Sequence, residues 1–321
     1  MSRWYLGVDT SNYRTSAAVF DAQTGLFHNS GRLLDVPDGK LGLRQSEALF
    51  QHTQRLHEQI AALPSGVGRQ LRAVCVSTRP RAVEGSYMPC FLAGESVARS
   101  AALLLDVPLY TASHQQGHLA AAALSAGRLD LLGQPLLAWH LSGGTTELLR
   151  VAPGADGLPQ AAIVGGSTDI SAGQLIDRTG VLLGLAFPAG GALEALAEKA
   201  QAVKPFPVKV QDGFFSLSGM QNQVEARFRA GQAPAEIARF ALETVLYAVE
   251  RATEQVRATH ALPVLCAGGV MGNRRIQTAL GQRFQALFAA PALSGDNAVG
   301  AAILAAQQNG ECLWQVPAST R

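Results

Sequence analysis

The sequence predicts an α/β protein made of two related halves. The chain opens with an apolar strand, a short polar turn and a second apolar strand over residues 4–20, and residues 137–151 repeat this pattern around Ser142-Gly143-Gly144. Each hairpin is followed by segments with alternating strand and amphipathic-helix patterns. Because the hairpins start about 130 residues apart, close to one domain length, we expect a duplicated fold with a cleft between two lobes.

Length and composition favour a soluble globular protein of about two domains. The chain has 321 residues, of which 48% are hydrophobic and 16% charged, so it can bury two cores. A formal net charge of +2 excludes a broad polyanion-binding face, so any contact with nucleic acid must be local or helped by a partner. No stretch is apolar enough for a membrane span or signal peptide. The scattered cysteines, without Cys-x-x-Cys spacing, favour reduced thiols and a cytoplasmic location.

The first half is expected to hold three hairpin strands, then a helix, a strand, a helix and a strand. After the opening hairpin, the patterns give a third strand within 25–36, a helix over 49–63, a strand at 71–77, a helix at 91–105 and a strand at 107–112. This order is typical of the ribonuclease-H-like unit found in the actin, sugar kinase and heat-shock ATPase fold.

The second half repeats the same logic. It is expected to contain the hairpin 137–151, a strand at 161–164, a Gly165-Gly166-Ser167 turn, a helix over 171–183, a loop at 187–191, an amphipathic helix over 234–260, strands at 264–267 and 286–290, and a small-residue helix over 297–307. The predicted lobes are residues 1–134 and 135–321, and the last helix is a candidate for packing back on the first lobe.

Two histidines four residues apart, His114 and His118, stand where a helix is expected to begin. Residues at this spacing share one helical face, so both imidazoles can bind one metal ion. The protease form of the motif carries glutamate after the first histidine, and Gln115 occupies that position, so a metalloprotease is not expected. The pattern alone leaves open that both histidines are solvated. Asp296, in a loop before the last helix, is either a third ligand or a helix cap.

Glycine-rich turns supply the candidate nucleotide contacts. Backbone N–H groups of a tight turn at Ser142-Gly143-Gly144 can cradle a phosphate, although an ordinary hairpin has the same residues. In the segment 266–275, a strand, a glycine turn and a helix start place Asn273 where it can bond a nucleotide; a tight strand-to-helix connection is the other interpretation. Asp177, inside the predicted helix 171–183, is either a ribose ligand or a solvated carboxylate.

Taken together, these motifs resemble the tRNA threonylcarbamoyladenosine transferase family, formerly called O-sialoglycoprotein endopeptidase. In chain order they are His114-x-x-x-His118, Leu141-Ser-Gly-Gly-Thr-Thr, Asp169-x-Ser-Ala-Gly-Gln-Leu-Ile-Asp177, Phe187-Pro-Ala-Gly-Gly, Phe215-Ser-Leu-Ser-Gly219, Gly268-Gly-Val-Met-Gly-Asn-Arg-Arg and Asp296-Asn-Ala. The resemblance covers nearly the whole chain, and the combination is far more specific than any single motif.

The resemblance implies an acyltransferase of tRNA modification. Such an enzyme moves a threonylcarbamoyl group from its adenylate to the exocyclic amine of the adenine beside certain tRNA anticodons. It implies one divalent metal, iron or zinc, held by His114, His118 and Asp296. His140 is a candidate fourth ligand, because archaeal and eukaryotic members have a tyrosine ligand at this position. The residues that match the family's contacts with an adenine nucleotide (ATP, AMP or threonylcarbamoyl adenylate) are Ser142, Gly143, Gly144, Asp177, Gly190 and Asn273.

The resemblance leaves the catalytic residues unassigned and the partners open. Candidates for partners are tRNA acting with other proteins and dimerisation with a family paralogue; no membrane is expected.

The sequence also departs from the family pattern, at positions that face the cleft in the family. The family's Glu-Thr-Ser-Cys-Asp is Asp9-Thr10-Ser11-Asn12-Tyr13 here, and Asp-Asp-Ala-Ala-Gly-Glu is Asp169-Ile170-Ser171-Ala172-Gly173-Gln174. A longer segment, Arg79 to Pro89, replaces Gly-Pro-Gly, and Gln221 replaces a lysine. The chain therefore resembles a divergent paralogue. One hypothesis is a working transferase; the other is a nucleotide- and metal-binding paralogue without transfer activity, acting as a regulatory or assembly partner.

Overall fold

The computed structural model describes residues 2–11, 13–36 and 43–313, so the turn residue Asn12 lies outside the described part. The chain divides into two compact units. The first comprises Met1–Gln134, Ala152–Gln160 and Ala292–Arg321, and the second comprises Pro135–Val151 and Ala161–Pro291. The first unit is therefore assembled from three separate pieces of the chain, and the last piece includes the C-terminal helix.

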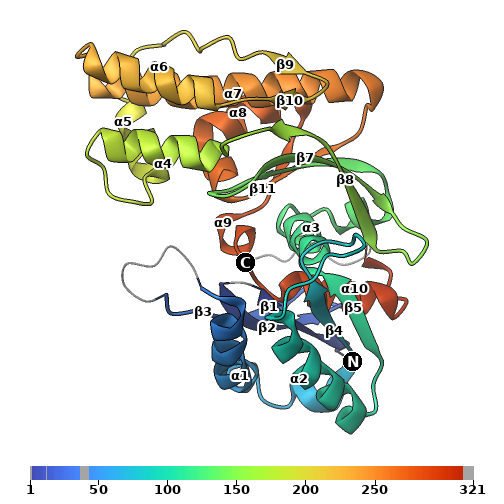
Figure 1. Ribbon diagram of the computed structural model, residues 1–321. Helices are drawn as coiled ribbons and strands as arrows, with labels where there is room; N and C mark the ends of the chain where they lie inside the picture. The colour runs from blue at the N-terminus through green and yellow to red at the C-terminus, as the bar shows by residue number, and fades with distance from the viewer. Residues whose placement is uncertain (1, 12, 37–42, 314–321) are drawn as a thin grey trace. The chain divides into compact units, whose positions relative to one another are not determined.

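The first unit is built on a mixed five-stranded sheet (Figure 1). Its order is β3 (Phe27–Leu33), β2 (Arg14–Asp21), β1 (Trp4–Ser11), β4 (Leu71–Arg79) and β5 (Leu109–Ser113). Strands β1, β2 and β3 are antiparallel neighbours, whereas β1, β4 and β5 run parallel. This arrangement is the one predicted from the order of strands and helices in the first half.

Helices cover both faces of this sheet. They are α1 (Gln45–Ala61), α2 (Phe91–Leu105), α3 (His114–Ser125) and α10 (Val299–Gln308), with short 3-10 turns at Val67–Gln70 and Leu129–Gly133. Alternate residues of β1 point to opposite faces. Leu6 and Val8 share a core cluster with Leu56 of α1 and Ala98 of α2. Gly7 faces the other way, where a side chain would overlap the backbone of Ala298, at the start of α10.

The second unit contains a seven-stranded sheet that repeats this topology. Its order is β12 (Leu287–Phe288), β11 (Val264–Ala267), β6 (Leu136–Leu141), β7 (Thr146–Pro153), β8 (Pro159–Ser167), β10 (Phe214–Phe215) and β9 (Val210–Gln211). Strands β6 and β7 are antiparallel, and β6, β11 and β12 are parallel. The run from β8 to β12 thus matches the run from β3 to β5, which confirms the predicted fold class of two similar halves.

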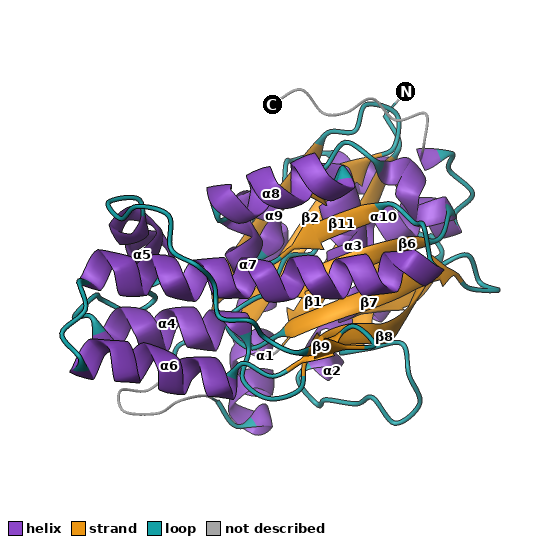
Figure 2. Cartoon of the chain, turned by 90° about the horizontal axis from the view of Figure 1, so that it is seen from above, coloured by secondary structure: helices purple, strands orange, loops and turns teal. Residues whose placement is uncertain are grey.

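The helices of the second unit include α7, which packs along the sheet (Figure 2). They are α4 (Ala172–Leu182), α5 (Gly190–Ala197), α6 (Ser218–Arg229), α7 (Pro234–Thr259), the 3-10 turn Gly269–Gly272, α8 (Arg274–Phe284) and α9 (Pro291–Ser294), whose last residues belong to the first unit. Phe240, Val245 and Val249 of α7 share a core cluster with Trp139. The indole of Trp139 donates a hydrogen bond to Thr253 at 2.8 Å, which fixes the helix on β6.

Two local expectations were wrong, and one helix was not predicted. Gly165-Gly166-Ser167 is the end of strand β8 and not a turn, because Gly166 and Ser167 pair with Phe214 and Phe215 of β10. Helix α5 begins at Gly190, inside the segment expected to be a loop, and α6 was not predicted.

Among the helices of residues 2–11, 13–36 and 43–313, none combines the length and the apolar character that a membrane span needs.

Candidate functional site

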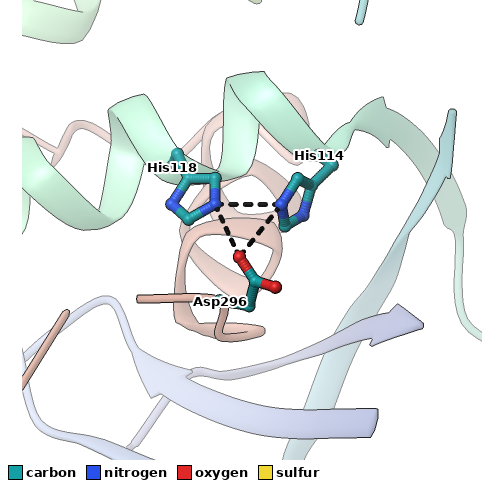
Figure 3. Close-up of side chains that lie close together, drawn as sticks. All are labelled: His114, His118 and Asp296. Carbon is teal, nitrogen blue, oxygen red and sulfur yellow. Dashed lines mark hydrogen bonds and ion pairs between the residues drawn. The ribbon is translucent and has the colours of Figure 1, made fainter. Parts of the chain in front are cut away.

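Two imidazoles and one carboxylate of the first unit converge on a single point (Figure 3). Helix α3 begins at His114 because Ser113 accepts a hydrogen bond from Gln116 N and so caps the helix. The Nε2 atoms of His114 and His118 lie 2.9 Å apart. Asp296 Oδ1 lies 3.2 Å from His118 Nε2 and 3.4 Å from His114 Nε2. We call these three side chains the His-His-Asp cluster.

A close helix crossing holds the cluster together. Gly117 on α3 and Gly300 on α10 touch so closely that a Cβ on Gly300 would overlap the carbonyl group of Gly117. Asp296 lies in the segment that leads into α10, and its carboxylate also accepts a long hydrogen bond from Ser11 Oγ at 3.5 Å. Asp296 is not the helix cap: Asn297 Oδ1 accepts the hydrogen bond from Val299 N. The carboxylate is thus free of the capping role that the sequence left open.

The chemistry of the cluster suits a transition metal. Metal–nitrogen bonds of about 2.0–2.1 Å in a tetrahedral zinc site place neighbouring ligand atoms roughly 3.3 Å apart. The three separations found here fall close to that value. Imidazole nitrogens with one carboxylate oxygen suit zinc or iron better than calcium or magnesium, which prefer oxygen ligands alone.

Charge interactions in the cluster shift the pKa values of His114 and Asp296 in the direction opposite to burial. Burial would lower the pKa of His114, but Asp9 and Asp296 outweigh it and raise this pKa to about 10. Burial would raise the pKa of Asp296, but His114 and His118 hold it well below its usual range. The two carboxylates therefore favour the protonated form of His114, and a metal ion that binds this ring would displace a proton.

His140, the candidate fourth ligand, belongs to the second unit. It lies on β6, opposite Glu147 on β7 and Ala267 on β11. The cluster found among the described residues consists of His114, His118 and Asp296. Participation of His140 stays a prediction.

The second unit contains a pocket of about 500 Å³, a volume within the usual range for small-molecule sites. It brings together four of the residues predicted to contact a nucleotide, namely Gly143, Asp177, Gly190 and Asn273. The other lining residues are Gly173, Ile176, Phe187, Pro188, Gly191, Glu194, Leu242, Gly269, Val270, Gly272 and Pro291. Ser142 and Gly144 flank Gly143 in the turn but do not line the pocket.

The start of α4 is fastened to the turn between β6 and β7. Ser171 Oγ donates a hydrogen bond to Gly143 O at 2.6 Å, and Ala172 N donates to Thr146 Oγ1 at 2.8 Å. Gly173 lies against this turn so closely that a Cβ would overlap the backbone of Ser142 and Gly143. One wall of the pocket therefore depends on a helix N-terminus packed directly on a hairpin turn.

The polar residues of the pocket also organise the surrounding helices. Asp177 Oδ1 accepts a hydrogen bond from Ala189 N at 2.8 Å, and Glu194 Oε1 accepts one from Arg274 N at 2.8 Å. Asn273 caps α8, because its Oδ1 accepts hydrogen bonds from Arg275 N and Ile276 N, each at 3.1 Å. Within the described part of the chain, the Nδ2 group of Asn273 donates to no protein acceptor. This amide is the donor that the cap leaves for a ligand.

Residues that depart from the family pattern have structural partners. Gln174 completes the capping box of α4, since its Oε1 accepts a hydrogen bond from Ser171 N at 3.1 Å. Gln221 accepts a hydrogen bond from Arg178 at 2.7 Å.

Asp169, which keeps the residue of the family pattern, also has a structural role. Burial would raise the pKa of Asp169, but hydrogen bonds from Ser216, Ser218 and nearby amides keep it well below its usual range. Asp169 thus fastens the start of α6 to the end of β8.

Sequence reasoning missed several residues of both sites. Asp9 contacts His114, but the sequence showed it only as a carboxylate at the end of the apolar run Tyr5-Leu-Gly-Val and as the first residue of a motif that departs from the family pattern. The apolar pocket wall from Ile176, Leu242 and Val270 was not predicted, because apolar residues on helices are ordinarily core residues. Glu194 was missed because it lies on α5, the helix that starts inside the expected loop.

The fold has recognisable counterparts among solved structures. HypF from T. kodakarensis superposes with a TM-score of 0.59 and 16% identity over 96% of this chain, although the chain spans only 48% of that protein. A ROK family protein from Streptococcus pneumoniae gives a TM-score of 0.52 at 12% identity, covering 96% of this chain and 99% of the other. At such low identities the likeness shows the fold alone, which is the actin, sugar kinase and heat-shock ATPase type.

Sequence relatives are more specific. A tRNA N6-adenosine threonylcarbamoyltransferase from Thermus thermophilus is 30% identical over 285 residues, covering 85% of this chain and 83% of the relative. The protein of the same name from Aromatoleum aromaticum is 32% identical over 288 residues, covering 86% and 81%. Residues 44–303 match the family model described as "TsaD: tRNA N6-adenosine threonylcarbamoyltransferase". The chain therefore belongs to the TsaD family of tRNA N6-adenosine threonylcarbamoyltransferases.

Proposed function

We propose that the chain transfers threonylcarbamoyl from its adenylate to the adenine beside the anticodon of certain tRNAs. The observation that carries this proposal is the His-His-Asp cluster, in which ligand atoms from the first and last pieces of the first unit lie within 3.4 Å of one another. Two imidazole nitrogens and one carboxylate oxygen are ligand types of zinc and iron, and their separations are close to those of such a site, so the convergence supports a metal-binding role within this family.

The pocket of the second unit supports the adenylate part of the proposal. Its walls of Ile176, Leu242 and Val270 suit a flat base, and its glycines allow close approach of a ligand to the backbone. Asp177 uses Oδ1 for Ala189 N, which leaves Oδ2 for a ribose hydroxyl. The Nδ2 group of Asn273 is placed to donate to the nucleotide, and the turn at Gly143 lies beside the pocket for a phosphate.

The metal in this proposal is a single iron or zinc ion held by His114, His118 and Asp296. When bound, it supplies Lewis-acid polarisation of a carbonyl or phosphate oxygen. The protein's own part is to hold the ligand atoms in place, to bind the adenylate and to orient its acyl group toward the acceptor amine.

A paralogue that binds nucleotide and metal without transferring the acyl group is the second candidate. It is favoured by Gln174 and Gln221, which stand where the family pattern has an acid and a lysine and whose side chains make helix-capping and helix–helix hydrogen bonds here. A neutral amide cannot supply the positive charge with which a lysine stabilises a developing oxyanion, and it cannot accept a proton as a carboxylate does. Such a protein would act as a regulatory or assembly partner.

A transfer assay separates the two candidates. Purified chain would be mixed with threonylcarbamoyl adenylate carrying a radiolabelled threonine and with tRNA lacking the modified base, with and without partner proteins from the same genome. If the chain is a transferase, the wild type should transfer label to tRNA. The rate of this transfer should be at least about 100-fold lower in His118→Ala, because that variant lacks one metal ligand. His57→Ala, a surface histidine of α1, is the control and should keep the rate. Bound adenylate without label in tRNA would establish the second candidate.

The remaining parts of the proposal concern the partners of the chain and its location in the cell. The chain binds tRNA with the help of partner proteins, it dimerises with a family paralogue, and it acts in the cytoplasm. Copurification of labelled tRNA with the chain, tested in cell extract with and without nuclease, checks the first of these.

A further inference from the structure

Asp9 is a buried carboxylate in the middle of the first unit. It lies on β1, is 2% exposed, and faces α3 and α10, on the same side of the sheet as Gly7. A charged carboxylate in such a place costs several kcal/mol unless its oxygens are paired. Both oxygens of Asp9 are paired. Oδ1 accepts a hydrogen bond from Ser11 N at 3.0 Å, and Oδ2 lies 2.8 Å from His114 Nδ1.

This contact leaves one arrangement of the His114 ring for metal binding. A carboxylate accepts hydrogen bonds, so Nδ1 carries a proton and donates it to Asp9 Oδ2. Nε2 is then the nitrogen that remains for a metal, and it is the atom that faces His118 Nε2 and Asp296 Oδ1. An imidazole ligand whose second nitrogen donates to a carboxylate is held in one tautomer and one orientation, and it is also a stronger base toward the metal.

The position of the carboxylate is itself rigidly determined. Asp9 pairs with Ser16 across the β1–β2 ladder, and Ser16 Oγ donates a hydrogen bond to the Asp9 carbonyl group at 3.2 Å. The next residue, Thr10, is held from the opposite face by hydrogen bonds to Cys90 O and from Gly94 N. The carboxylate therefore sits on a strand that is fastened on both sides, which suits a group that must orient another.

We propose that Asp9 is the positioning residue of the metal centre, fixing His114 so that its Nε2 lone pair points at the metal. The inference rests on the metal-binding part of the proposed function and adds to it. The competing explanation is a structural one, in which the Asp9–His114 pair only fastens α3 to β1. The two differ in one respect: a structural pair affects stability alone, whereas a positioning pair affects metal affinity in the folded protein.

The test compares two buried carboxylates of the same hairpin. Asp9→Asn keeps the shape and an acceptor for Ser11 N, but its amide donates toward His114 Nδ1 and so favours the proton on Nε2, where it blocks the metal. Asp21→Asn is the matched control: Asp21 is 1% exposed on β2 and accepts hydrogen bonds from Arg3 N, Gln23 N and Thr24 Oγ1, away from the cluster. Zinc dissociation constants would be measured by competition with a chromophoric chelator, with far-ultraviolet circular dichroism to verify folding.

The expected result is a roughly 10- to 100-fold higher zinc dissociation constant for Asp9→Asn and an unchanged constant for Asp21→Asn. Equal zinc affinity in folded Asp9→Asn and wild type would overturn the positioning role. Absence of zinc binding by the wild type itself would instead overturn the metal part of the proposed function.

A second measurement needs no variant of Asp9. In zinc-loaded wild type with ¹⁵N-labelled histidine, two-bond ¹H–¹⁵N correlation spectra distinguish protonated from metal-bound ring nitrogens. The His114 signal, assigned by its loss in His114→Gln, should show a protonated Nδ1 and a metal-bound Nε2. A His114 ring bound through Nδ1, or carrying its proton on Nε2, would contradict the inference even if Asp9→Asn did not fold.

Discussion

Ser171 Oγ donates a hydrogen bond to the carbonyl oxygen of Gly143 at 2.6 Å, which joins the first turn of α4 to the turn between β6 and β7. The same hydroxyl accepts a hydrogen bond from Gln174 N at 3.0 Å and so caps the helix. One side chain therefore sets both the start of α4 and the position of a pocket residue. We therefore expect a small added side chain at this junction to destabilise the protein more than the same addition at an open position of another helix.

Gly173→Ala should destabilise the protein by about 1–3 kcal/mol, because its new methyl group meets the backbone of Ser142 and Gly143, which cannot move without breaking the hairpin turn. Gly191→Ala is the matched control, a helical glycine in α5 whose added Cβ meets nothing within 4 Å. It should be neutral or gain up to about 1 kcal/mol. Urea unfolding measures both; equal effects of the two substitutions would contradict the packing argument.

Asn273→Asp and Asn273→Ala should separate ligand binding from helix capping. The aspartate variant keeps the oxygen that caps α8 but lacks the Nδ2 donor and adds a negative charge, so AMP affinity should fall at least about tenfold while stability without ligand changes little. The alanine variant loses the cap as well and should cost about 1 kcal/mol of stability.

Titration calorimetry and thermal unfolding measure these two effects. Thr278→Ala, at an exposed position on the same helix, serves as the control. The prediction is wrong if the Asn273→Asp variant binds AMP as tightly as wild type does.

Wild-type protein purified without chelator should contain about one metal ion per chain, because three ligand atoms converge in the His-His-Asp cluster. His118→Ala and Asp296→Asn should each lose most of it. Elemental analysis by mass spectrometry gives the content. Unchanged metal in either variant would remove that residue from the ligand set.

His52 should make the stability of the protein depend on pH in a defined window. It is fully buried on α1, Nδ1 pairs with Thr15 Oγ1 at 2.8 Å, and burial lowers its pKa from 6.5 to about 4. Between these values only the unfolded chain takes up a proton at this residue. The stabilisation is therefore complete above pH 6.5 and falls, by up to about 3 kcal/mol, as the pH drops toward 4.

Urea unfolding of His52→Phe at several pH values measures this contribution as a difference from wild type. The variant should lose less stability than wild type between pH 6.5 and pH 4, since it has no proton to take up at this position. His57→Gln changes an exposed histidine of the same helix and should parallel wild type. Parallel curves for His52→Phe and wild type would show that His52 titrates alike in both states.

Regular elements could be predicted where the local pattern and the packing agree. Helix α2 spans the predicted residues 91–105, and strand β11 spans the predicted residues 264–267. Helix α5 could not be predicted, because it begins with two glycines and is held by Leu193 and Ala197 packing against Ile176 and Leu242. Helix α6 begins without a side-chain cap, so the sequence carried no start signal for it.

The candidate sites show the same division. The spacing of His114 and His118 on one helix is a local property, and so their proximity could be predicted. Asp296 is 178 residues from His118. Its position in a loop left a helix cap and a third ligand as alternatives, and the resemblance to a family implied the ligand. Asp9 could not be assigned at all, because its contact depends on which face of β1 it occupies and on which helix covers that face.

The three-piece construction of the first unit has a consequence for protein synthesis. Helix α10 covers β1 and packs on α3, yet it is synthesised after the whole of the second unit. A nascent chain that has just completed α3 still lacks both the helix that buries one face of its sheet and the carboxylate that completes the His-His-Asp cluster. The first unit can therefore be completed only after α10 has been made, whereas the whole second unit is synthesised beforehand, and a ribosome that stops before residue 296 releases a chain without the complete cluster.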